Sequence, residues 1–143
     1  MTTRREQILS AIVTALAGTT GVSTRIYRSR VDPVSRAESP ALIVEPVNDV
    51  PTQNTSLPTL DHTLTVRVLV IVRASVPDQA ADPIIESLHT RLMTNATLGG
   101  LVMDIQPGAT DFSLESADVS VGVIACLFRV LYRTRVNDLS QGT

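Results

Sequence analysis

The chain has 143 residues, the length of one ordinary domain, and hydrophobic residues make up 43% of it, which is typical of a globular protein. Its formal net charge of −2 at pH 7 excludes the basic surplus with which proteins bind nucleic acids or anionic membranes in general. All of its Lys+Arg residues are arginines, which are favoured at protein interfaces and are equally explained by a GC-rich genome.

Cellular location is indicated by cysteine content and apolar runs. Cys126 is the only cysteine, so an intrachain disulfide is excluded and the chain suits a reducing compartment. The N-terminal segment is amphipathic, which argues against a signal peptide. The longest apolar run, residues 68–72, is too short to span a bilayer. We therefore expect synthesis in the cytoplasm.

The first predicted element is a helix from Thr3 to Ala17. Thr3 and Glu6 have the spacing of a capping box, and Gly18 suits a helix end. Apolar residues follow at helical spacing and form one face: Ile8, Leu9, Ile12, Val13 and Leu16.

Strands are predicted next. Residues 24–29 form a short β-prone stretch, and a polar connection over 30–39 leads to a second strand at 40–47. Pro46 indicates that this second strand is short or lies at a sheet edge. Residues 48–59 are polar and contain two prolines, so they form either a loop or a projecting hairpin.

Two long strands are the clearest elements, at 60–74 and 119–136. In the first, Leu64, Val66, Val68, Val70 and Val72 share one face, and Thr63, Thr65, Arg67, Leu69, Ile71 and Arg73 share the other. In the second, Ile124, Cys126, Phe128, Val130 and Tyr132 share one face, and Val121, Val123, Ala125, Leu127, Arg129, Leu131 and Arg133 share the other. Both strands thus carry aliphatic residues on both faces.

A second helix is predicted between them. Asp82 and Pro83 suit its N-cap and first position, although a start nearer Asp78 places Pro83 awkwardly inside the helix. Its apolar stripe is Ile84, Ile85, Leu88 and Leu92. A short strand at 101–106 follows, with another at 111–116.

These elements predict an α+β fold: a mixed, mostly antiparallel sheet of about four to six strands with two helices packed on one face. Residues 1–136 form the single domain, and 137–143 form a flexible tail. The helices cover one sheet face only, so either the sheet folds over on itself or another subunit packs on the second face. The arginines among the aliphatic residues of the long strands either bond to a partner carboxylate or are exposed charges that prevent aggregation.

The search for catalytic or metal-binding residues finds no enzyme motif and no cofactor site. His62 and His89 have no metal ligands at suitable spacing, and we interpret both as structural. Asp78, Asp82 and Glu86 recur every four residues and are interpreted as acids near a helix start rather than as a cation site. A looser acidic group is interpreted as a solvated face: Asp104, Asp111, Glu115 and Asp118.

Taken in order, the segments resemble the tail terminator (tail completion) proteins of long-tailed bacteriophages. The resemblance covers nearly the whole chain apart from the tail and depends on order and spacing. It is carried by Arg5–Leu16, Ile26–Arg30 (Ile-Tyr-Arg-Ser-Arg), Ser39–Val44 (Ser-Pro-Ala-Leu-Ile-Val), Leu64–Val68, Leu98–Ile105 (Leu-Gly-Gly-Leu-Val-Met-Asp-Ile), Thr110–Asp118 and Val130–Thr134.

The resemblance implies a non-enzymatic virion protein, assembled in the host cytoplasm, whose hexameric ring caps the tail tube and stops its polymerisation. It also implies a docking surface for head-completion or neck proteins, with DNA only passing through the channel. Alternatives are another neck, head–tail connector or baseplate subunit, or a small ligand- or metal-binding module near Asp82 and Glu86. The expected interface residues are Arg28, Arg30, Asp49, Pro51, Gln53, Asn54, Pro58, Arg67, Arg73, Arg129 and Arg133.

Overall fold

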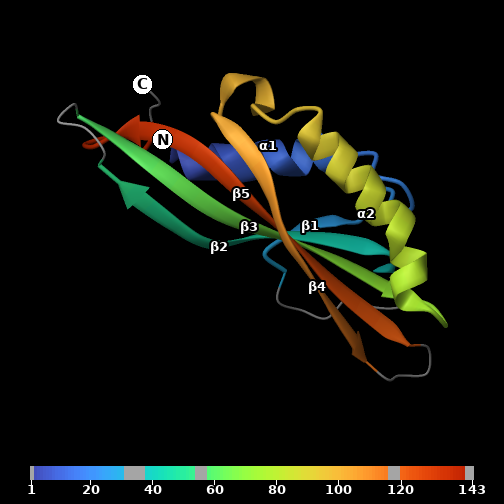
Figure 1. Ribbon diagram of the computed structural model, residues 1–143. Coiled ribbons are helices and arrows are strands. Elements are labelled where there is room, and N and C mark those ends of the chain that lie inside the picture. Colours follow the sequence, from blue (N-terminus) through green and yellow to red (C-terminus); the bar gives the residue numbers. More distant parts are fainter. Residues whose placement is uncertain (1, 31–37, 54–57, 116–119, 141–143) are drawn as a thin grey trace.

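The computed structural model describes residues 2–30, 38–53, 58–115 and 120–140, which form one five-stranded sheet with two α-helices (Figure 1). The strand order is β1-β2-β3-β5-β4; β1 runs parallel to β2, and the other neighbours are antiparallel. The elements are α1 (Arg4–Leu16), β1 (Ile26–Arg28), β2 (Ala41–Thr52), β3 (Thr59–Arg73), α2 (Pro77–Met93), the 3-10 turn η2 (Leu98–Gly100), β4 (Asp104–Glu115) and β5 (Val121–Arg135). The predicted α+β class, with a mixed and mostly antiparallel sheet, is confirmed.

Both helices lie on the same side of the sheet (Figure 1). α1 packs beside β1 and β2, whereas α2 packs over β3, β5 and β4. Every second side chain of the two long strands packs against the helices, as the alternating pattern predicts. This core includes Ile8, Ile12, Leu16, Leu88, Leu92, Leu64, Val66, Val68, Val70, Ile124, Phe128 and Val130. Neither described helix is long and apolar enough to cross a membrane.

The polar excursion is part of a β-hairpin. β2 continues to Thr52 and pairs with β3 up to Asp61, so the prediction that the strand ends at Val47 is wrong. A register shift between Pro46 and Asn48 lets the strand pass the first proline. β1 pairs with β2 only up to Val44. Pro46 and Pro51 therefore lie in the part of β2 that forms a sheet edge, where a missing N–H is tolerated.

Helix α2 begins earlier than its proline pattern predicts. Pro77 is at its start, Val76 is the N-cap, and Pro83 lies inside the helix. Asp82 is therefore not the N-cap. The side chain of Pro83 is exposed, so the carbonyl that it leaves without a donor is on the solvent side of the helix.

β4 is a single edge strand where two short ones were expected. Its pairing with β5 shifts register between Pro107 and Thr110 and then resumes. At Gly108 an added Cβ would lie 3.1 Å from the Leu127 carbonyl oxygen, so the bulge brings the two backbones close together there. The Pro-Gly pair therefore makes a bulge in the strand and does not end it.

The C-terminal residues fold back toward the start of α1. The Arg4 N–H donates to the Leu139 carbonyl at 2.7 Å, and Gln7 Nε2 donates to the Ser140 carbonyl at 3.4 Å. Hydrogen bonds from Ser140 lower the pKa of Asp138. The folded unit therefore extends beyond the predicted boundary at 136 to Ser140, and residues 141–143 lie outside the described part of the chain.

Candidate functional site

One face of the sheet carries no described helix and is apolar along its middle. Leu69 and Ile71 on β3 lie opposite Ala125 and Val123 on β5, and Ile43 lies opposite Leu69 on the other side. Ile43, Leu69, Ile71 and Val123 form a second cluster, separate from the main core, with Tyr27, Ala41 and Val121. We call this surface the helix-free face. The sheet is open, so within the described residues it does not cover this face by folding over on itself.

Arginines alternate with the aliphatic residues on the helix-free face. Arg67 bonds to Glu45 across the strands, with Nη2 to Oε1 at 2.6 Å. Arg133 bonds to Asp61 at 2.6 Å, and this hydrogen bond raises the pKa of Arg133. Arg129 is exposed, and Arg73 lies opposite Val121 at the strand end. The structure thus places all four predicted strand arginines on one surface, where Arg67 and Arg133 are bonded to acids of the same subunit.

The other predicted arginines lie at β1, on the far edge of the sheet. Arg28 donates two hydrogen bonds to Glu6 on α1, at 3.2 and 3.0 Å, and this lowers the pKa of Glu6. Arg30 bonds to Glu38 at 2.6 Å and stacks over Tyr27. They are therefore separate from the strand arginines and form a second group.

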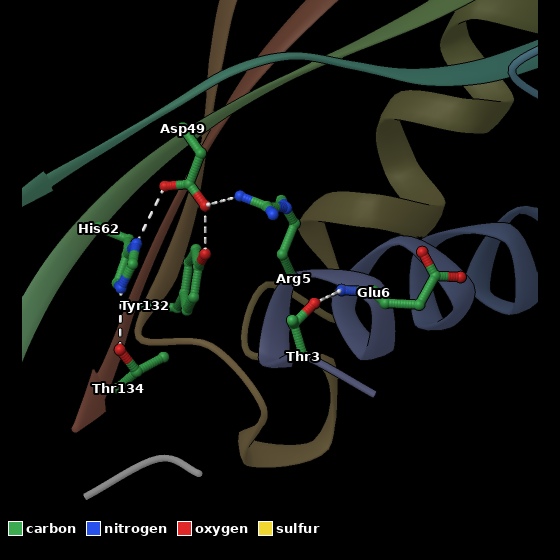
Figure 2. A network of polar contacts seen from close by, with 7 residues as sticks. All are labelled: Thr3, Arg5, Glu6, Asp49, His62, Tyr132 and Thr134. Carbon is green, nitrogen blue, oxygen red and sulfur yellow. Dashed lines mark hydrogen bonds and ion pairs between the residues drawn. The ribbon is translucent and has the colours of Figure 1, made fainter. Parts of the chain in front are cut away.

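The hairpin residues divide into exposed and buried ones. Pro51, Gln53 and Pro58 are exposed, and Asn54 lies outside the described residues. Asp49 differs, since its side chain is only 7% exposed and points under α1 (Figure 2). Its contacts in this state are with the same subunit.

Asp49 is the centre of a buried polar network (Figure 2). Its Oδ1 lies 3.0 Å from His62 Nδ1, and its Oδ2 accepts hydrogen bonds from the Tyr132 hydroxyl and, at 3.1 Å, from Arg5. His62 Nε2 lies 2.9 Å from the Thr134 hydroxyl oxygen, and the His62 ring stacks on that of Tyr132. The network therefore connects β2, β3, β5 and α1.

A hydroxyl, an imidazole and a carboxylate in series resemble the parts of a nucleophilic site. However, Thr134 is 1% and His62 is 5% exposed, so a substrate has no access to the hydroxyl in this state. Burial, followed by the hydrogen bond to Asp49, raises the pKa of Tyr132 and keeps its hydroxyl a donor. The arrangement satisfies buried polar groups and fixes the strands relative to α1.

The alternation of side chains along β3 and β5 predicts part of the Asp49 network. His62 and Tyr132 share the parity of the core residues on their strands and are direct cross-strand partners, which predicts two polar rings on the buried face. Asp49 had no such signal, because its segment did not show strand alternation. Only the pairing of Asp49 with Leu64 identifies it as a strand residue.

The remaining polar residues are solvent-facing. His89 is exposed, with its ring tilted against Phe128 at a centroid distance of 6.5 Å. Asp78, Asp82, Glu86 and Asp111 are exposed, and Asp118 lies outside the described residues. Within the part of the chain that the structure describes, no group of three or more His, Cys, Asp or Glu side chains could hold a metal ion.

A polar groove of about 550 Å³ runs between α2 and the loop after α1. Its lining residues are Thr20, Pro83, Glu86, Ser87, Thr90, Arg91 and Thr94. Arg91 donates to the Gly18 carbonyl at 2.8 Å, and Ser87 accepts from the Thr20 N–H. These bonds join the loop to α2, so the groove side of α2 faces α1.

Neither a scan against protein-family models nor a search of curated proteins finds a match for this chain.

Proposed function

We propose that the chain is a structural assembly subunit whose copies form a ring that caps the end of a phage tail tube. The capped end then offers a docking surface to head-completion or neck proteins. The observation that carries the proposal is the helix-free face, an apolar sheet surface that no described part of the chain covers. The role is non-catalytic and places the protein in the virion.

The energy of the helix-free face supports a partner there. Ile43 and Ile71 are almost fully buried, whereas Leu69, Val123 and Leu127 are partly exposed. Covering apolar surface yields roughly 25 cal/mol per Å². The arginines around it provide forked donors that suit carboxylates of a partner.

The β2–β3 hairpin supports a second contact. Its outer half carries the exposed Val47 and Val50, at 47% and 52% exposure. The hairpin extends away from α2 (Figure 1), and the Asp49 network fixes its outer half. A rigid, exposed apolar projection suits a protein that must reach a neighbouring protein, because little ordering entropy is lost on binding.

Tube length is the decisive measurement. Purified tail tube protein should polymerise to shorter tubes, with a narrow length distribution in negative stain, when the subunit is added. Another neck, connector or baseplate subunit would leave tube length unchanged. An unchanged distribution at saturating subunit therefore contradicts the capping role.

Charge reversal tests the helix-free face itself. Arg67→Glu/Arg129→Glu should weaken capping, because it places acids at the centre of the proposed contact. Arg91→Glu, on the helix side, makes the same kind of change away from that face and should cap normally. Circular dichroism confirms that each variant is folded. Normal capping by the double variant would place the contact elsewhere.

A further inference from the structure

The sheet ends in an open strand edge on both sides. On one side the outer edge of β4 has no partner among the described residues. On the other side β1 covers β2 only up to Val44, so the stretch from Glu45 to Thr52 has no second neighbouring strand among the described residues. Open edges present unpaired N–H and C=O groups and are usually protected or paired. Both edges are therefore available to another molecule.

Exposed apolar side chains accompany both edges. Phe112 and Leu114 on β4 are 60% and 59% exposed, and Val76 just before α2 is 48% exposed. Leu114 and Pro77 both approach Gly122, which places the start of α2 beside the end of β4. On the other edge, Val47 and Val50 are similarly exposed. Single exposed aliphatic residues are common, but two apolar groups on opposite edges of one sheet indicate contact surfaces.

The β4 edge is acidic on both of its sides. Asp111 is exposed on β4, on the helix-free face. Asp78 and Asp82 are exposed on α2, at the spacing that puts them on one side of the helix, together with His89. That side faces away from the groove between α2 and the α1 loop. We call Asp78, Asp82, Asp104 and Asp111 the acidic flank.

The opposite edge is basic. Arg25, Arg28 and Arg30 surround β1, and Arg4 and Arg5 begin the neighbouring α1. Internal acids engage Arg5, Arg28 and Arg30. Arg25 is partly exposed and, among the described residues, donates to the backbone carbonyls of Pro40 and Gly21. We call these five arginines the basic flank.

From this arrangement we infer that the acidic flank of one copy docks against the basic flank of the next copy, with the open edges of β4 and β2 brought together. The occupant is a second copy of this chain, because only the two flanks of one molecule are known to carry complementary charge and apolar edges. The contact joins two different surfaces and so propagates head to tail, which closes into a ring when the rotation fits. The inference rests on the proposed function, which requires copies to associate. It leaves the apolar middle of the helix-free face of every copy available to the tube or neck protein.

A charge-swap experiment tests the contact. The two variants are Asp82→Arg/Asp111→Arg and Arg25→Glu/Arg28→Glu. Each alone should associate at least ~10-fold more weakly than the wild type, since like charges then face each other. An equimolar mixture should restore the ring, because each reversed flank then meets an opposite charge and each native flank meets its native partner. Native mass spectrometry should show the two variants alternating, which only an even number of subunits permits.

A matched control is Thr90→Arg, which adds the same charge on the groove side of the same helix and should associate like the wild type. Mixed variants that remain folded yet unassembled would overturn the inference, as would a wild type that stays monomeric at its highest soluble concentration. Tubes capped normally by both swapped variants would also overturn it while leaving the proposed function intact. Rings that form and swap as expected but do not shorten tubes would contradict the proposed function alone.

Discussion

Replacing Asp49 with alanine removes the acceptor at the centre of the buried network. The Tyr132 hydroxyl and His62 Nδ1 both lose their partner, and their residues are 2% and 5% exposed. Each buried polar group left unsatisfied costs roughly 1–3 kcal/mol. Arg5, at 43% exposure, adds at most about 1 kcal/mol because solvent screens it. We expect a loss of roughly 4 kcal/mol in the free energy of unfolding.

Urea denaturation followed by circular dichroism suits this measurement, because the chain has no tryptophan. The protein concentration must be held below that at which copies associate, since association adds to apparent stability. Arg5→Ala is the matched control: it removes one bond to the same carboxylate from the exposed side, and we expect about 1 kcal/mol or less.

A double-mutant cycle then tests whether the contacts act as a unit. Asp49→Ala combined with Tyr132→Phe should cost less than the sum of the two single changes, with a coupling of roughly 1–3 kcal/mol. An Asp49→Ala loss no larger than that of Arg5→Ala would refute the reasoning, because it would mean that water satisfies these groups without the carboxylate.

Three further predictions follow from buried groups. The raised pKa of Tyr132 makes its neutral form part of the folded state, so its contribution to stability should be complete below the ordinary tyrosine pKa and be lost as pH rises above about pH 10, by up to about 1.4 kcal/mol per pH unit, in urea titrations; Tyr132→Phe should remove this part of the slope. Burial raises the pKa of Cys126, so a thiol reagent at pH 8 should label it only after unfolding, and rapid labelling of the native protein would contradict its burial. Gly122→Ala would put a Cβ 2.6 Å from that of Pro77 and should cost roughly 1–3 kcal/mol in a urea titration; an unchanged midpoint would show that α2 shifts freely.

The elements that sequence predicted well were those with a clear period. Residues 60–74 and 119–136 alternate over their whole length, and the long strands β3 and β5 follow them within two residues at each end. The first helix combined a capping box with a continuous apolar stripe, and the Thr3 hydroxyl does accept from the Glu6 N–H. In each case local chemistry and tertiary burial favour the same structure.

The errors share a physical cause, which is proline at a solvent-facing position. Pro46 indicates a short or edge strand, Pro83 suits a helix start, and the predicted strand at 101–106 stops just before Pro107, yet each proline lies inside an element. A missing N–H is costly only where a backbone acceptor would otherwise receive a hydrogen bond from it. At an open edge or on the exposed side of a helix it is cheap, and exposure of that kind is decided by the tertiary fold.

The site shows the same division. Parity on β3 and β5 predicted which arginines share the helix-free face, because that property is local. The Asp49 network and the two oppositely charged flanks were not predictable in this way. Both depend on which strands become neighbours. The order β1-β2-β3-β5-β4 puts β5 beside β3, which is distant in sequence, and puts β1 and β4 on opposite edges of the sheet.

The network and the flanks are also physically linked through β2. Beyond Val44 that strand has a neighbour on one side only within the described part of the chain, and such an edge would ordinarily fray. Asp49 lies in this half and is held by donors from β3, β5 and α1 at once. Ordering the edge before any partner arrives reduces the entropy lost on docking. Asp49 also pairs with Arg5, so among the described residues the positive charge of the basic flank that no acid pairs with includes Arg25, beside the outer edge where a second copy would dock.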